Sequence, residues 1–74
     1  MPHVKIQHFP VSLSETAQHT LAEDIAQAIT RAFGCRANVV SIALEAVSPD
    51  DWQEQVYRPE IENKKDGLIK QPNY

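Results

Sequence analysis

The chain has 74 residues and a mass of 8.3 kDa, a length that holds one small domain, residues 1–74, and excludes a second. Hydrophobic residues make up 42% and charged residues 23%, which excludes the composition of a disordered protein. The net charge of -3 gives no basic surface for nucleic acid, and no apolar run approaches the roughly 20 residues of a membrane helix.

A core of this size stabilises a fold by only a few kcal/mol, so an additional support is expected. The single cysteine, Cys35, cannot form an internal disulfide or build a structural zinc site. Oligomerisation remains as the support. The N-terminal segment lacks the apolar stretch of a signal peptide, so we expect a cytoplasmic protein in which Cys35 is a free thiol.

Residues 3–9 alternate between polar and apolar, which predicts a half-buried strand. Val4 and Ile6 share one face of this strand, and the other face carries His3, Lys5 and Gln7.

A long amphipathic helix is expected next. Ser12 and Glu15 have the spacing of a capping box, which predicts a helix start at this point. Apolar residues then recur from Leu13 to Phe33 at helical spacing, and Gly34 follows where a left-handed residue ends a helix.

Residues 39–45 are rich in β-branched side chains and alternate again, which predicts a second strand. Strand, helix and strand form one βαβ unit with parallel strands, an α/β fold. The helix should cover the face that bears Val4, Ile6, Val40, Ile42 and Leu44. Two strands alone are not a stable sheet, so we expect pairing with a second copy into a homodimer. The opposite, polar face should stop assembly there, because burying unpaired charges is costly.

The last third of the chain predicts two short helices. Ser48 and Pro49 fit the start of a helix that carries Trp52 and Val56. A second helix is expected from Pro59 to Asp66, with Gly67 ending it as Gly34 ends the long one. Residues 68–74 form a partly apolar tail that packs back on the body.

Pro2 is the most informative residue for chemistry. Removal of Met1 before a small residue would leave the Pro2 nitrogen as a free secondary amine at the start of a strand. An α-amino group titrates near 7.7 to 8.0, and burial or a nearby cation lowers that pKa. Pro2 is therefore a candidate general base near neutral pH.

The ordered set of features resembles the 4-oxalocrotonate tautomerases, most closely their small dimeric PptA-like branch. The resemblance covers nearly the whole chain. It is carried by the Met1-Pro2 start, the strand of residues 3–9, the helix end Ala28-Ile29-Thr30-Arg31, the strand of residues 40–44, the turn of residues 48–52 with its aromatic side chain, and the tail of residues 68–74.

The resemblance implies a keto–enol proton transfer by Pro2 without cofactor or metal. Relatives hold substrate oxygens with two arginines beside an aromatic wall. The matching positions carry Trp52 for the aromatic, Ser41 for one arginine, and Ser12 or Leu13 for the other. Since both arginines are missing, a phenylenolpyruvate-like substrate fits better than a dicarboxylate. Arg36 and Arg58 are the candidates for a replacement cation.

Two other functions stay open at this point. The missing arginines are compatible with a dimeric binding module that keeps the fold without catalysis. Hydration or dehalogenation of an unsaturated acid would need a carboxylate or arginine to activate water, and the matched positions supply neither. Turnover of a simple enol substrate distinguishes the binding module from the tautomerase.

Overall fold

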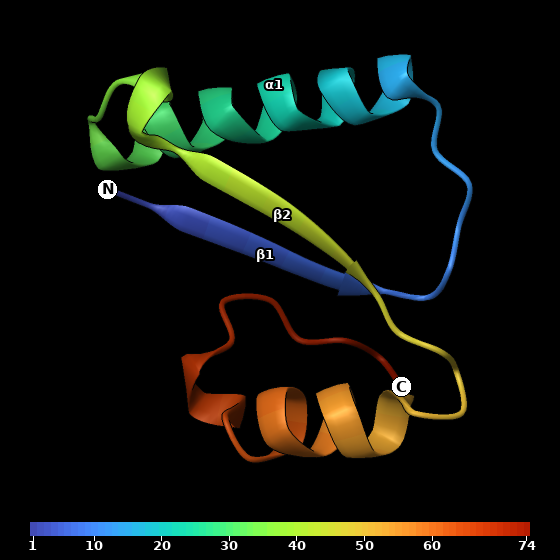
Figure 1. Cartoon of the computed structure of the whole chain (residues 1–74). Coiled ribbons are helices and arrows are strands. Elements are labelled where there is room, and N and C mark those ends of the chain that lie inside the picture. Colours follow the sequence, from blue (N-terminus) through green and yellow to red (C-terminus); the bar gives the residue numbers. More distant parts are fainter.

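The computed structural model describes residues 1–74, the whole chain, as a small α/β fold (Figure 1). Strand β1 (His3–His8) leads into helix α1 (Glu15–Phe33), and strand β2 (Ser41–Ala46) follows a short 3₁₀ turn, η1 (Ala37–Val39). The C-terminal third holds a π-helical segment, η2 (Gln53–Glu62), and a second 3₁₀ turn, η3 (Lys65–Gly67). Neither of the two longer helical segments combines the length and apolar character needed to span a bilayer.

The two strands pair in parallel, as the βαβ pattern predicts. The register runs without a break from His3 opposite Ser41 to His8 opposite Ala46. The second strand begins two residues later than expected, because the amides of Val39 and Val40 bond back to Arg36 and Ala37 at 3.2 and 3.1 Å. These amides close the η1 turn and are therefore not part of the sheet.

Helix α1 begins at a different serine from the one predicted. Ser14, not Ser12, is the N-cap: its backbone is extended, and its Oγ accepts a hydrogen bond from the Ala17 amide at 3.1 Å. Glu15 is then the first helical residue, so it cannot complete a capping box with Ser12. The helix end is as predicted, because Gly34 has φ 70° and its amide donates to the Thr30 carbonyl at 2.9 Å.

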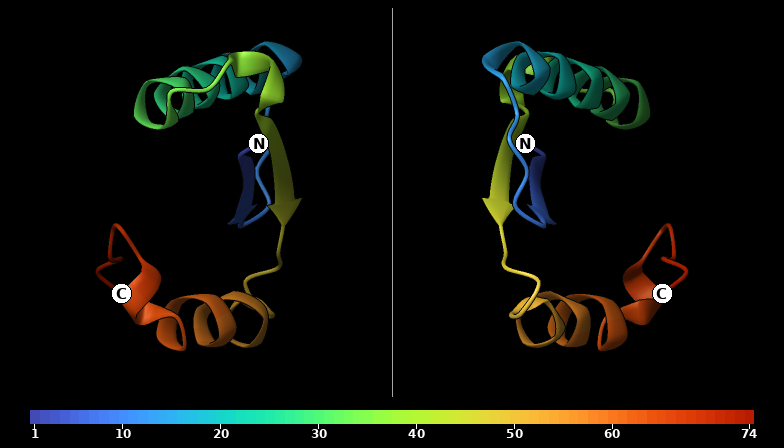
Figure 2. Two further views of the ribbon diagram at one scale, coloured as in Figure 1. Left: turned by 90° about the vertical axis from the view of Figure 1, so that its left-hand side faces the viewer. Right: turned by 90° about the vertical axis from the view of Figure 1, so that its right-hand side faces the viewer.

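The sheet lies between two helical layers. Figure 1 shows it from the β2 edge, with α1 above and η2 below, and Figure 2 shows both helical segments extending sideways past β1. A hollow of about 330 Å³ separates α1 from the sheet, and its lining identifies the face that α1 covers. That lining consists of Gln18, Leu21, Ala22, Ile42 and Leu44. Helix α1 therefore faces the apolar side of the sheet, as the alternation predicts.

The apolar layer of a single chain is open. Only Val47 and Val56 are buried, each with 4% of its surface exposed, and Leu44 keeps 37% exposed. Val40, expected on the covered face, precedes β2 and is not part of the strand. The β1 edge of the two-stranded sheet has no neighbouring strand within the chain.

The C-terminal third differs from the two helices predicted. One segment, η2, runs through Pro59, and the Asn63 amide bonds to the Arg58 carbonyl five residues back at 3.0 Å. Proline breaks an α-helix because its ring meets the carbonyl four residues earlier. We attribute the continuity of η2 to its wider five-residue turn, which relieves that clash. Gly67 lies in η3 without a positive φ, so it does not end a helix as Gly34 does.

Candidate functional site

Pro2 lies directly before β1 and is held by the neighbouring strand. Its carbonyl accepts a hydrogen bond from the Ser41 amide at 3.2 Å, which extends the pairing of the strands to the start of the chain. Pro2 itself is half-buried, whereas Met1 beside it is 99% exposed. While Met1 is attached, the Pro2 nitrogen is an amide without basicity, and removal of Met1 turns it into an amine.

Ser41 is brought to the same end of the sheet by the strand register. It stands opposite His3, and its Oγ lies 2.6 Å from His3 Nδ1 in a hydrogen bond whose direction depends on the ring tautomer. The sequence predicts a site role for Ser41 but not for His3. The two residues become neighbours through the register of the strands, and their spacing in the sequence does not reveal this register.

Trp52 lies at the other end of the sheet. Its ring packs edge-on against Phe9, with the ring centroids 5.0 Å apart. A strand rises about 3.3 Å per residue, so the six residues of β1 separate the two ends by about 20 Å. Within one chain the structure therefore does not bring Trp52 next to Pro2, although the family resemblance predicts that both residues belong to one site.

A hollow of about 550 Å³ opens beside Trp52. It is the largest of the three hollows of the chain, and it lies between the end of β1, the start of η2 and the C-terminal residue. Its lining is Gln7, His8, Phe9, Trp52, Gln53 and Tyr74. Phe9 and Tyr74 are aromatic lining residues for which the sequence predicts no site role.

The two candidate cations lie apart. Arg36 directly precedes η1, which leads into the start of β2, so Arg36 lies toward the Pro2 end of the sheet, and its side chain is exposed. Arg58 lies within η2 on the opposite layer and is also exposed. Neither guanidinium forms an ion pair. Ser12 and Leu13 lie in the connection between β1 and α1, away from the Pro2 end.

The polar face of the sheet carries a charged network. Glu45 accepts hydrogen bonds from Gln7 Nε2 at 2.7 Å and from Lys5 Nζ at 3.1 Å. The hydrogen bond from Gln7, followed by that from Lys5, lowers the pKa of Glu45 below its ordinary value of 4.5. Lys5 is therefore already paired and is not an unpaired cation for a ligand.

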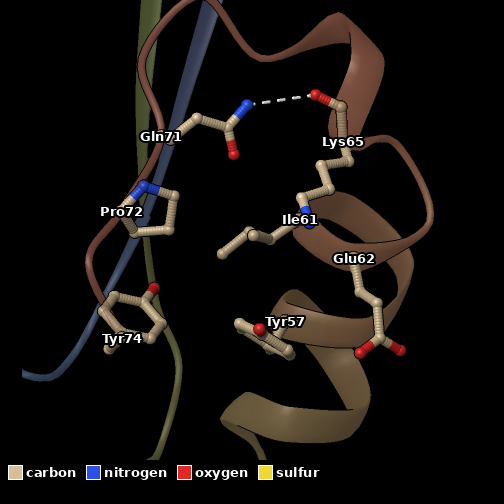
Figure 3. A pocket seen from close by; sticks show the side chains of 7 residues that line it. All are labelled: Tyr57, Ile61, Glu62, Lys65, Gln71, Pro72 and Tyr74. Carbon is tan, nitrogen blue, oxygen red and sulfur yellow. Dashed lines mark hydrogen bonds between the residues drawn. The ribbon is translucent and has the colours of Figure 1, made fainter.

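A smaller cavity of about 190 Å³ lies between η2 and the tail (Figure 3). Figure 3 shows Tyr57 and Tyr74 on its two sides. The Nε2 of Gln71 donates a hydrogen bond of 3.2 Å to the Lys65 carbonyl, and this bond closes the cavity. The tail thus packs back on the body, as predicted. None of the residues selected from the sequence lines this cavity.

The whole chain is similar in sequence to several known proteins. No family model matches the chain. Three relatives that share the name Tautomerase PptA each align over 74 residues, 100% of this chain and 97% of their own length. They come from Enterobacter sp. (strain 638), with 46% identity, Pectobacterium carotovorum subsp. carotovorum (strain PC1), with 39%, and Escherichia coli O9:H4 (strain HS), with 38%.

The chain belongs to the PptA-like branch of the 4-oxalocrotonate tautomerase superfamily. Identity of this size over the full length confirms the resemblance seen in the sequence. Relatives named tautomerases indicate an isomerase that acts on a small molecule.

Proposed function

We propose that the chain is a keto–enol tautomerase in which the Pro2 nitrogen, after loss of Met1, acts as both general base and general acid. The observation that carries the proposal is the position of Pro2 in a member of a tautomerase family: it begins β1, and the Ser41 amide holds its carbonyl. An α-amine with its ordinary pKa of about 7.7 to 8.0 has roughly a tenth of its molecules unprotonated at pH 7, so both the base form and the acid form are present.

The proposed reaction needs only one proton carrier. The Pro2 amine takes the proton of the enol hydroxyl, the electron pair moves through the conjugated system, and the protonated amine returns a proton to carbon. The reverse sequence converts the ketone to the enol. Atoms and charges balance, and no cofactor or metal takes part.

We further propose that the active unit is a homodimer formed through the free edge of β1. A two-fold axis perpendicular to β1 at this edge makes the β1 of the second copy antiparallel, so the end of one β1 meets the start of the other. This pairing brings the partner subunit's Trp52 toward Pro2. The proposal is supported by the arrangement in Figure 2, where α1 and η2 overhang the β1 edge on both sides.

A singly charged arylenolpyruvate is the proposed class of substrate. Ser41 stands where a second cation would favour a dicarboxylate, and Lys5 is already paired with Glu45. Arg36, exposed and outside any ion pair, remains the proposed cation nearest the Pro2 end. The aromatic hollow beside Trp52 suits an aryl group.

Replacement of Pro2 tests the assignment. Pro2→Ala keeps a primary amine, so kcat/KM for ketonisation of phenylenolpyruvate should fall about 100-fold without vanishing, within the usual range for acid–base groups. Pro10→Ala, an exposed proline after β1, is the control and should keep wild-type turnover. Intact mass should show that Met1 is absent from the active protein. Unchanged turnover of Pro2→Ala, or full activity with Met1 retained, would overturn the proposal.

A further inference from the structure

The side chains of His3 and Ser41 form a hydrogen-bonded pair that the proposed proton transfer does not use. Both residues are exposed, and the Oγ of Ser41 lies 2.6 Å from Nδ1 of His3. His3 follows Pro2 directly, and the amide of Ser41 bonds to the Pro2 carbonyl. The pair is therefore formed by the residue that follows Pro2 along the chain and by the residue whose amide bonds to Pro2 across the strands.

Few other donors are available at this end of the sheet. Lys5, the next residue on the same strand face, is 3.1 Å from Glu45 and therefore neutralised. Arg36 approaches along the chain before β2 but makes no ion pair with the sheet. The Ser41 hydroxyl and the His3 ring are therefore the donors fixed on the polar face nearest Pro2.

The tautomer of His3 decides what the hydroxyl of Ser41 offers to a ligand. When Nδ1 carries the proton, the ring donates to Oγ, and the hydroxyl hydrogen can point outward. When Nδ1 is bare, the hydroxyl donates to the ring and presents only lone pairs outward. An anionic oxygen selects the first arrangement, because a hydroxyl–carboxylate hydrogen bond is among the stronger kinds.

We propose that His3 and Ser41 form an oxygen-binding pair for the carboxylate of the substrate, with Ser41 as the contact and His3 as its positioning residue. This inference rests on the proposed function and adds a basis for substrate selection. The pair makes the site prefer an enol acid to the matching neutral ester. His3 acts by holding the serine hydroxyl in the donating direction.

Kinetics with two substrates test the pair. Ser41→Ala should raise KM for phenylenolpyruvate about tenfold, the usual effect of losing a hydrogen bond to a charged group. The KM for its methyl ester should change less than threefold, and kcat should stay near the wild-type value for both. Ser41→Thr keeps the hydroxyl and should restore most of the affinity for the acid.

Variants of His3 test the positioning role. His3→Phe should raise KM for the acid about fivefold, whereas His3→Asn, whose amide can replace Nδ1, should rescue it. His19→Phe on α1 removes an exposed histidine from another element and should have no effect. A fall in kcat with unchanged KM, or equal losses for acid and ester, would overturn the inference.

A binding measurement separates this inference from the proposed function. Cinnamate is a planar carboxylate that cannot tautomerise, and cinnamamide is its neutral counterpart. Titration followed by the NMR shift of the backbone amide at position 41 should show weaker cinnamate binding in Ser41→Ala, with cinnamamide binding unchanged. Equal affinity of wild type and Ser41→Ala for cinnamate rejects the pair. If the wild-type protein prefers cinnamate to cinnamamide but does not turn over phenylenolpyruvate, the proposed tautomerase activity is rejected instead.

Discussion

Trp52 meets Phe9 edge to face, with the ring planes at 88° and the centroids 5.0 Å apart. This contact ties the start of η2 to the end of β1, although the two residues are 43 positions apart in sequence. It also forms one wall of the largest hollow in the chain. The aromatic wall is therefore built by two elements rather than by Trp52 alone.

Trp52→Ala should lower activity more than stability. Aromatic pairs contribute about 0.5–1.5 kcal/mol beyond area burial, so the loss of fold stability should be modest. We expect kcat/KM for phenylenolpyruvate to fall at least about tenfold, as for loss of a well-packed binding contact. Trp52→Phe keeps an aromatic wall and should stay within threefold of wild type. Full activity per folded molecule in Trp52→Ala would make the residue purely structural.

The assembly in solution should be a dimer. The polar face of the sheet holds the Lys5 and Glu45 pair, and Gln7 on this face lines the hollow beside Trp52 and Tyr74. Stacking dimers through this face would desolvate the charged pair. Sedimentation near neutral pH should therefore give about twice the chain mass of 8.3 kDa. A hexamer at low micromolar concentration contradicts this prediction.

Stability should depend on Glu45 in acid. Hydrogen bonds from Gln7 and Lys5 lower the pKa of this carboxyl below 4.5, so the folded state favours its ionised form. That contribution is present above 4.5 and is lost as the pH falls through the lowered pKa. Glu45→Gln should therefore unfold at lower urea than wild type at pH 7, and the gap should close below pH 4.

Glu54→Gln is the matched control for this measurement, because Glu54 is exposed on η2 and has no ion-pair partner. Its urea midpoint should follow the wild-type protein across the same pH range. A gap for Glu45→Gln that is unchanged from pH 7 to pH 3 would show that its carboxylate is not the source of the effect.

The two serines before α1 should differ in their effect on stability. Ser14→Ala removes the hydroxyl that accepts from the Ala17 amide and should cost about 1 kcal/mol of unfolding free energy. Ser12→Ala, two residues earlier, removes no cap and should stay within about 0.5 kcal/mol of wild type. Urea unfolding of the two variants provides the comparison, and equal losses would contradict the observed cap.

Local patterns predict the elements of this chain better than their boundaries. Alternation locates β1 to within one residue, because only an extended chain puts Val4 and Ile6 on one face. Val39 is β-branched, as is Ile42 in β2, so its place in a 3₁₀ turn depends on which carbonyl its amide reaches. Pro59 likewise marks a break in an α-helix but not in a π-helical segment.

The sequence predicts individual residues of the candidate site, but not how the fold arranges them. Pro2 stands out by its chemistry, and Ser41 by its matched position. The bond between His3 and Ser41 depends on strand register, which becomes known only when the pairing is seen. The separation of Trp52 from Pro2 follows from the strand length and the parallel direction, whereas motif matching treats both residues as one site.

The small number of buried residues links folding to protein concentration. Only Val47 and Val56 are enclosed by their own chain, so the proposed homodimer would cover apolar surface that a single chain leaves open. In such a dimer, folding and assembly would form one equilibrium, so that dilution destabilises the fold and the thermal midpoint rises with protein concentration. Specific activity should then fall in highly diluted assays. Lack of activity at nanomolar enzyme concentration would therefore indicate subunit dissociation before it indicates a loss of catalytic ability.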